Sequence, residues 1–138
     1  MAREIKFRAW YKYYKKMVDV LSIDFINKKL YIEVDKKGNP FGYINFDDCE
    51  LMQLTGIKDK SGVDIYEGDI LKTKYGGTGI VKWQKESVMF RYYKITGLNE
   101  YGEIVKFVAG TEIFYHGAKE FEVIGNIHAN HELLEVQS

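Results

Sequence analysis

Cysteine and proline are nearly absent from this chain of 138 residues, which contains one of each, Cys49 and Pro40. A single cysteine excludes an internal disulfide framework and favours a reducing compartment. No apolar run approaches the length of a membrane span, and the N-terminal Met-Ala-Arg-Glu-Ile-Lys segment has no apolar signal core. The sequence therefore predicts a cytoplasmic protein that does not bind a membrane.

The chain also has no net charge, because its 20 Lys and Arg residues are balanced by 20 Asp and Glu residues. Without a net positive charge, no long-range field recruits nucleic acid or an anionic surface. The content of apolar residues (46%) and charged residues (29%) is ordinary for a folded protein and excludes a mainly disordered chain. The neutral charge thus argues against strong nonspecific binding of nucleic acid.

Aromatic residues and glycines are abundant, with 11 Tyr, 8 Phe and 13 Gly. Aromatic rings suit half-buried strand faces, and glycines suit tight turns. The sequence predicts a mainly β fold: a small antiparallel barrel with SH3-like character, extended hairpins, and one or two short helical turns. A chain of this length buries roughly two-thirds of its unfolded surface. That burial suits either a single domain over 1–138 or two intertwined lobes at about 1–50 and 51–138.

Alternating apolar and polar residues predict the individual strands. Lys6–Trp10 places Phe7 and Ala9 on one face, and the clearest hairpin turn is Tyr75-Gly76-Gly77. Asn130 is predicted to cap a terminal helical turn, and a strong turn is expected before Pro40. The other predicted strands are 17–25, 30–34, 41–46, 51–55, 63–66, 69–74, 78–83, 88–95, 104–109 and 121–127.

Four blocks occur along the chain in the order found in a known family. They are Ile5-Lys-Phe-Arg-Ala-Trp10, Met52-Gln-Leu-Thr-Gly-Ile-Lys-Asp-Lys-Ser-Gly-Val-Asp-Ile-Tyr-Glu-Gly-Asp-Ile70, Gly79-Ile-Val-Lys-Trp83 and Glu122-Val-Ile-Gly-Asn-Ile127. Together they resemble the YopX protein family, small proteins of phages and prophages of Gram-positive and gut bacteria. The resemblance runs from about residue 3 to residue 134.

This resemblance implies a predominantly β protein with SH3-like barrel character that associates with itself in the cytoplasm of a bacterial host. It implies no activity, because the family offers no established biochemical function and no catalytic residues. Two positions depart from the family pattern. Tyr11 stands where Asp often follows the Ala-Trp pair, and His131 stands where a proline usually opens the last helical turn.

Carboxylates are densest at Asp59, Asp64, Glu67 and Asp69, but the ordered ligand pattern of an EF-hand loop is absent. A paired-carboxylate hydrolase would need two of them to face each other across a cleft. We interpret Asp59 and Asp69 as caps that accept backbone N–H bonds in turns, with Asp64 and Glu67 in solvent. The alternative is a metal-dependent hydrolase built on Asp64, Glu67, Asp69 and His128.

Histidine is scarce, with His116, His128 and His131 alone. A zinc site on His128 and His131 would need further ligands, such as His116 or Cys49. We interpret the histidines as surface residues and Cys49 as structural, since three carboxylates adjoin it in the chain and would raise its pKa. The sequence predicts no cofactor, no metal and no catalytic residue.

Two segments mix aromatic rings with cations, Lys12–Lys16 and Arg91–Lys94. Such side chains hold single-stranded nucleic acid on small barrels. If both segments shared one face, they would form a groove for nucleic acid or a protein partner. The other interpretation packs the tyrosines on sheet faces and leaves the lysines in solvent or at a subunit interface. The candidate contact residues are Lys12, Tyr13, Tyr14, Lys15, Arg91, Tyr92 and Tyr93.

We therefore expect a phage or prophage accessory protein that is not an enzyme and that acts as a binding or assembly module. Its expected partners are an unidentified host or phage protein and a second copy of itself, because open edge strands favour a homo-oligomer. A single-stranded nucleic-acid-binding β-barrel is the first alternative, and the metal-dependent hydrolase is the second.

Overall fold

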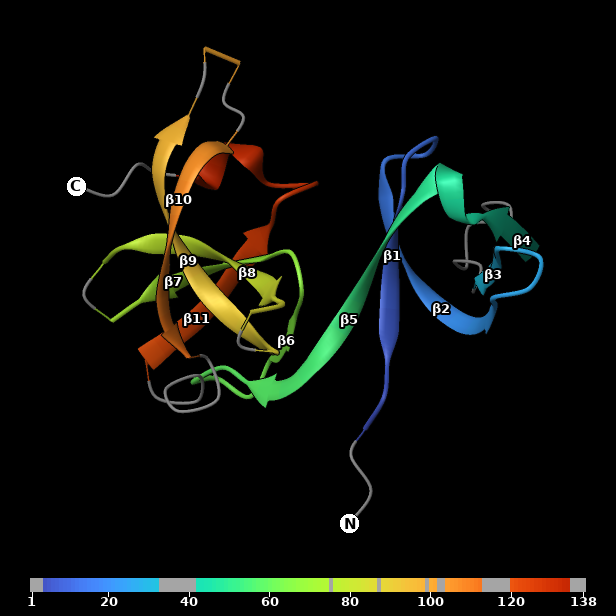
Figure 1. The fold of residues 1–138 in the computed structure, drawn as a ribbon, viewed down its shortest axis with the longest axis horizontal. Coiled ribbons are helices and arrows are strands. Elements are labelled where there is room, and N and C mark those ends of the chain that lie inside the picture. Colours follow the sequence, from blue (N-terminus) through green and yellow to red (C-terminus); the bar gives the residue numbers. More distant parts are fainter. Residues whose placement is uncertain are drawn as a thin grey trace. The chain divides into compact units, whose positions relative to one another are not determined.

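Strands make up most of the regular structure in the computed structural model, which describes residues 4–32, 42–74, 76–86, 88–98, 100–101, 104–112 and 120–134 (Figure 1). Helical structure in these ranges is limited to two short 3-10 turns, η1 (Phe46–Asp48) and η2 (His131–Leu133), and to the single helical residue Glu120. The predicted mainly β fold with short helical turns is therefore confirmed. The strands are β1 (Phe7–Tyr11), β2 (Lys16–Asp24), β3 (Lys29–Ile32), β4 (Gly42–Asn45), β5 (Cys49–Lys58), β6 (Asp64–Tyr66), β7 (Asp69–Thr73), β8 (Thr78–Gln84), β9 (Met89–Leu98), β10 (Ile104–Glu112) and β11 (Phe121–Asn126).

The strands form two antiparallel sheets, with orders β4-β3-β2-β1-β5-β6 and β10-β9-β8-β7-β11. No pairing among the described strands closes either sheet into a barrel, and the SH3-like character stays a prediction. The chain divides into two compact units, Met1–Gln53 (unit 1) and Leu54–Ser138 (unit 2), with the boundary inside β5. Whether they count as one domain or two lobes also stays a prediction.

Unit 1 buries one face of its sheet. Ala9 in β1 is opposite Val18 in β2 and Leu51 in β5, so these three side chains lie on the same face. Ala9 is fully buried there. Because side chains alternate along a strand, the neighbouring Arg8 and Trp10 lie on the other face. The buried cluster of unit 1 is Ala9, Leu30, Ile32, Ile44 and Cys49.

Unit 2 buries both faces of its sheet. Tyr92 packs with Phe121 and other buried residues in one cluster, whereas Tyr93 packs with Ile80 and Leu134 in another. The C-terminal residues thus cover the second face of β7, β8 and β9. Gly79 lies where a side chain would meet the Tyr93 carbonyl and the Tyr92 ring, so the strands approach each other too closely there for any larger residue.

The end of the chain corrects one prediction. Asn130 precedes η2 but makes no capping bond with its side chain. Its Oδ1 instead accepts the N–H of Asn126 at 3.1 Å, which fastens the turn after β11. The predicted turn before Pro40 and the hairpin residue Tyr75 lie outside the described residues. In the described part of the chain, no helix has the length and apolar character needed to cross a membrane.

Candidate interaction surface

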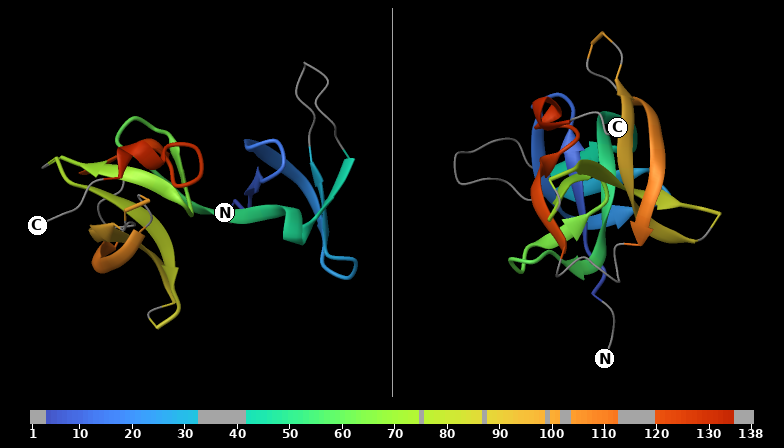
Figure 2. Two further views of the ribbon diagram at one scale, coloured as in Figure 1. Left: turned by 90° about the horizontal axis from the view of Figure 1, so that it is seen from above. Right: turned by 90° about the vertical axis from the view of Figure 1, so that its left-hand side faces the viewer.

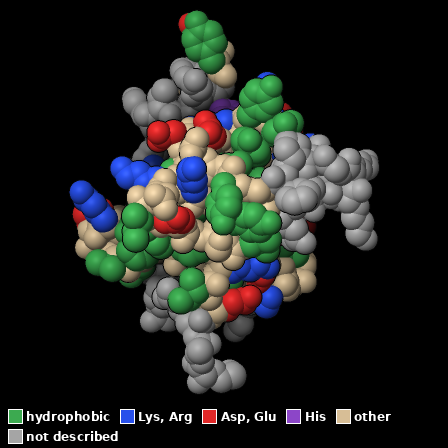
Figure 3. Space-filling view, turned by 90° about the vertical axis from the view of Figure 1, so that its right-hand side faces the viewer, with side chains coloured by type: hydrophobic (Ala, Val, Ile, Leu, Met, Phe, Trp, Pro, Cys, Tyr) green, Lys and Arg blue, Asp and Glu red, His purple; other side chains and the backbone are tan. Residues whose placement is uncertain are grey.

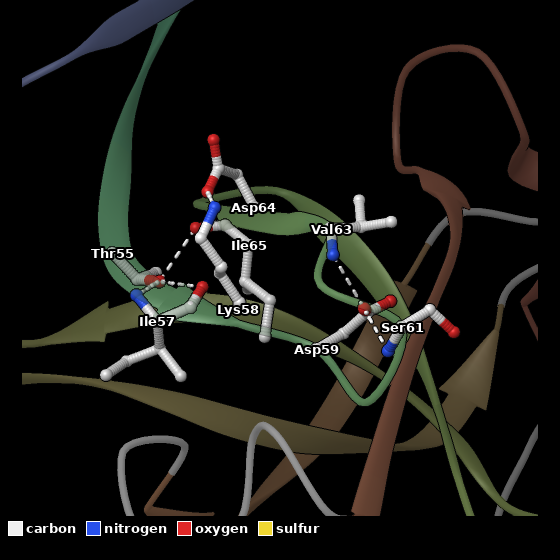
Figure 4. A network of polar contacts seen from close by, with 8 residues as sticks. All are labelled: Thr55, Ile57, Lys58, Asp59, Ser61, Val63, Asp64 and Ile65. Carbon is white, nitrogen blue, oxygen red and sulfur yellow. Dashed lines mark hydrogen bonds and ion pairs between the residues drawn. The ribbon is translucent and has the colours of Figure 1, made fainter.

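Asp59 lies between β5 and β6 and is 3% exposed. Its Oδ1 accepts the N–H groups of Ser61 (2.8 Å) and Val63 (2.9 Å) (Figure 4). Its Oδ2 accepts the N–H of Val123 in β11 at 2.9 Å. Burial raises the pKa of this carboxyl, but the N–H bonds from Val123, Val63 and Ser61 and the charge of Lys60 outweigh it and leave the pKa below its ordinary value. The prediction that Asp59 caps a turn is confirmed.

The same turn also covers the outer edge of β11. The N–H of Lys60 donates to the Phe121 carbonyl at 3.0 Å, next to the bond from Val123 to Asp59. These two groups of β11 point away from β7, because Glu120 and the alternate residues after it pair with β7. The turn at Asp59 and Lys60 therefore takes the place of a neighbouring strand.

Thr55 and Gly56 form a bulge in β5. The Thr55 hydroxyl donates to the Ile65 carbonyl at 2.7 Å, and its oxygen accepts the N–H of Ile57 at 3.1 Å (Figure 4). Gly56 has φ +86°, a conformation that other residues rarely adopt, and the β5–β6 pairing shifts register here. These two residues shape the backbone and leave no sign of a phosphate-binding loop.

Two of the remaining acidic side chains form a hydrogen bond or an ion pair with neighbouring groups. Asp69 is 1% exposed, and its Oδ2 accepts the N–H of Tyr66 at 2.7 Å, which confirms the second predicted cap. The Asp64 carboxylate forms an ion pair with Lys58 at 2.8 Å (Figure 4). Glu67 is partly buried. The hydrolase alternative therefore needs Asp64 and Asp69 to leave the partners that hold them.

Cys49 and the described histidines do not form a zinc centre. No group of three His, Cys, Asp or Glu side chains within the described ranges could hold a metal ion. Cys49 is 6% exposed and its Sγ donates to the Phe46 carbonyl at 3.5 Å; burial, followed by the charge of Glu50, raises the pKa of its thiol. His128 lies in the turn after β11 and His131 opens η2, while His116 lies outside the described residues.

The β1–β2 turn, Lys12–Lys15, presents aromatic rings to solvent. Tyr13 is 80% exposed, and its ring meets Tyr14 edge to face at 4.9 Å between centroids. Tyr14 in turn meets Tyr11 at 5.1 Å, so the three rings support one another. Lys12 pairs with Glu50 at 3.4 Å, which offsets part of the positive charge of the turn, while Lys15 is exposed. We call Lys12–Lys15 the tyrosine turn.

The second predicted contact segment has a different environment. Tyr92 and Tyr93 in β9 are 3% and 8% exposed, and burial raises the pKa of Tyr92 to about 12. Their rings belong to the two cores of unit 2 and are unavailable to stack on a base. This corrects the predicted contact role of Tyr92 and Tyr93 and agrees with the other interpretation, in which the tyrosines pack on sheet faces. Arg91 is partly buried in the same strand, and the tyrosine turn lies in unit 1.

Unit 1 also exposes large apolar side chains that the sequence analysis did not single out. In the β2–β3 turn, Asp24 Oδ1 accepts the N–H groups of Ile26 and Asn27, each at 3.0 Å. These bonds hold Phe25 and Ile26 in solvent, 71% and 91% exposed, and Tyr43 in β4 is 68% exposed. The sequence did contain a signal for this exposure: two apolar residues follow an Asp in a turn, where residues are usually polar. Figure 3, which faces the side of β3 and β4, shows hydrophobic side chains at the surface among lysines and carboxylates.

The chain has recognisable relatives. A family model described as YopX protein matches residues 6–135. A solved structure, "Crystal structure of protein EF1440 from Enterococcus faecalis", is 29% identical to this chain with a TM-score of 0.52, and the alignment covers 97% of this chain and 100% of that one. No curated protein matches. Because the family model spans nearly the whole sequence, the chain belongs to the YopX protein family.

Proposed function

We propose that this protein is a non-enzymatic accessory factor of a phage or prophage, which binds a host or phage protein in the bacterial cytoplasm. The observation that carries the proposal is the tyrosine turn, where one ring is 80% exposed and is held by edge-to-face contacts. Exposed tyrosines that are already ordered lose little conformational entropy on binding and are enriched at the centres of protein interfaces.

A protein partner fits this surface better than nucleic acid does. Stacking of single-stranded nucleic acid uses several rings along a positively charged groove. Tyr92 and Tyr93 are buried, and Lys12 is paired with Glu50. The tyrosine turn therefore offers rings beside one paired and one exposed lysine, too few cations for a positively charged groove, which favours a polar protein surface over a phosphate backbone.

A binding role also agrees with the state of the acidic residues. The carboxylates of Asp59 and Asp69 are buried and accept backbone N–H groups. A catalytic carboxylate has to reach substrate or a metal ion. These two side chains instead support the fold, so the proposal assigns no chemical step to them.

The test is a tagged pull-down from a bacterial host lysate, divided into nuclease-treated and untreated halves. The wild-type chain is compared with the double variant Tyr13→Ser/Tyr14→Ser and with Tyr101→Ser, a matched control because Tyr101 is 79% exposed and lies in unit 2. The proposal expects a protein that survives nuclease, is captured by wild type and the control, and is lost with the double variant.

Two results would contradict this assignment. Equal capture by all three chains would remove the tyrosine turn as the contact surface. Partners that disappear after nuclease treatment, together with recovered DNA or RNA, would replace the protein-binding proposal with the nucleic-acid-binding alternative.

A further inference from the structure

The strand β4 is the last strand of its sheet and pairs with β3 alone among the described strands (Figure 1). Their pairing is regular, with Leu30 opposite Ile44 and Tyr31 opposite Tyr43. The N–H of Phe46 donates to the Lys28 carbonyl at 2.9 Å, and hydrogen-bonded pairs alternate along an antiparallel ladder. The backbone groups of Ile44 therefore face β3, and those of Tyr43 and Asn45 face away from it.

This outer edge lacks the usual protection against strand pairing. Edge strands are commonly blocked by a lysine, a proline or a bulge, whereas Gly42–Asn45 has no charge, no proline and no register shift. The outer edge of β11 in unit 2 is protected, because Asp59 and Lys60 form hydrogen bonds with its backbone groups. Among the described residues, one sheet edge is thus covered at β11, whereas no backbone hydrogen bond between them covers the outer edge of β4.

We propose that β4 pairs antiparallel with β4 of a second copy, with a two-fold axis at Ile44. Tyr43 then lies opposite Asn45 of the partner subunit, and each Asn45 N–H donates to the carbonyl of Tyr43 across the axis. This register uses the outward-facing groups of both strands, brings no like charges together, and joins the two buried clusters at Ile44. The inference goes beyond the proposed function, because a monomer could use the tyrosine turn without it.

The aromatic side chains of β3 and β4 support a second copy as the occupant. The Tyr43 ring meets Tyr31 at 5.1 Å between centroids and is otherwise 68% exposed. In the proposed register the two Tyr43 side chains are diagonal neighbours, a separation that aromatic rings bridge. Two Tyr31–Tyr43 pairs would therefore join into one row of rings across the axis.

The apolar area available to this dimer is small. Phe25 is 71% exposed in the β2–β3 turn, which lies beside η1 just after β4 (Figure 2), and its ring meets Phe46. An aromatic side chain buries about 150–250 Å². Tyr43 and Phe25 of two copies thus supply roughly 500 Å² of apolar surface, so with the short strand the interface belongs to the small, reversible class. We expect a dimer that dissociates in the micromolar range.

The decisive variant is Asn45→Pro, measured by sedimentation velocity over a series of protein concentrations. Asn45 has φ −75° and ψ 150°, which a proline adopts without strain, and its N–H points away from β3. The variant should fold, yet it loses both donors at the axis and places ring atoms there. Asn45→Ala is the matched control, because it removes the same side chain and its 3.4 Å contact with Asp48 but keeps the N–H.

The proposal expects Asn45→Pro to raise the dimer dissociation constant at least about tenfold and Asn45→Ala to change it by less than about twofold. Tyr43→Lys, which puts a charge on the edge, should also give monomers. A wild-type chain that stays monomeric throughout the micromolar range, or an Asn45→Pro chain that dimerises like wild type, would overturn the proposal. Capture of a protein by Asn45→Pro in the pull-down would keep the proposed function intact.

Disulfide trapping tests the register. Directly opposite hydrogen-bonded residues have Cα atoms about 5.5 Å apart, within disulfide range, whereas diagonal neighbours are about 7–8 Å apart. A mixture of Tyr43→Cys and Asn45→Cys chains should therefore form a covalent dimer on mild oxidation, and Tyr43→Cys alone should not. The native Cys49 is buried and gives little background. Cross-linking of Tyr43→Cys alone as fast as the mixture would refute this register.

Discussion

Asp59 provides the sharpest test of how unit 2 is held together. Its carboxylate accepts three backbone N–H groups, those of Ser61, Val63 and Val123, while it is 3% exposed. A hydrogen bond to a charged group contributes roughly 1.5–3 kcal/mol, and such contributions add incompletely when they share one side chain. We expect Asp59→Ala to lower the free energy of unfolding of unit 2 by about 4 kcal/mol.

Asp59→Asn tests the contribution of the negative charge, because asparagine has nearly the same size and shape as aspartate but is neutral. Its amide oxygen can still accept the N–H groups of Ser61 and Val63, but its NH₂ group would face the N–H of Val123. The expected loss is about 2–3 kcal/mol. Asp64→Asn is the control, because the partly exposed Asp64–Lys58 pair should contribute only about 0–1 kcal/mol.

The assay is urea unfolding at pH 7 in a Trp10→Phe background. Trp83 in β8 is then the sole tryptophan and reports on unit 2. Losses for Asp59→Ala and Asp59→Asn as small as that for Asp64→Asn would refute the reasoning, because the three bonds would then contribute no more than a surface ion pair.

The pH dependence checks the same bonds independently. The pKa of Asp59 in the folded protein lies below its ordinary value of 3.8. The unfolded chain therefore binds this proton first, so the stabilisation is complete above about pH 5 and is lost as the pH falls through the folded pKa. Asp59→Asn should flatten the acid side of the stability profile. An unchanged acid profile in that variant would assign the pH dependence to other carboxyls.

Three further predictions concern buried positions. Gly79→Ala should destabilise unit 2 by about 3 kcal/mol in urea titrations, because the new Cβ would clash with Tyr92 and Tyr93. Gly56→Ala, which has open space around it but φ +86°, should destabilise it by only about 1–2 kcal/mol. A larger loss for Gly56→Ala than for Gly79→Ala would contradict the packing at Gly79. Between pH 10 and 12 the protein should lose stability, because the pKa of Tyr92 is raised to about 12 and the unfolded tyrosine releases its proton first. Tyr92→Phe should remove part of this loss, and identical stability profiles of wild type and variant above pH 10 would contradict the prediction. Cys49 should react with Ellman's reagent slowly until denaturant is added, and immediate reaction in the native state would contradict its burial and raised pKa.

Local patterns predicted the strands well because each strand needs only its own alternation. Phe7 and Ala9 were placed on one face of β1, and Ala9 is fully buried. The same rule places Tyr92 and Tyr93 on opposite faces of β9, which is correct, but it does not tell which face is covered. Leu134 covers that face from 41 positions away in the chain. Local alternation does not reveal such long-range cover, so the mixture of rings and cations at Arg91–Lys94 left a contact role open for both tyrosines.

The candidate surface was predicted only in part, for a related reason. Tyr13 was identified because lysines surround it in sequence, and it is exposed. Phe25 and Tyr43 were placed in the predicted strands 17–25 and 41–46, and Ile26 was given no role, since apolar side chains are usually buried. Their exposure depends on the bonds of Asp24 and on the end of the sheet at β4. Both are features of the folded unit.

Met52–Ile70, the longest of the four blocks that carry the family resemblance, therefore has an architectural role. Within Met52–Ile70, the Thr55 hydroxyl and the carboxylates of Asp59 and Asp69 bond to backbone groups, and Gly56 adopts a conformation that needs glycine. These residue types are required wherever this bulge, turn and edge cover are built, whatever the protein binds. This part of the family resemblance therefore reflects how β5, β6 and the turn between them fold. Function is better sought in the exposed side chains of unit 1, the tyrosine turn and the β4 edge, whose identities the fold itself does not require.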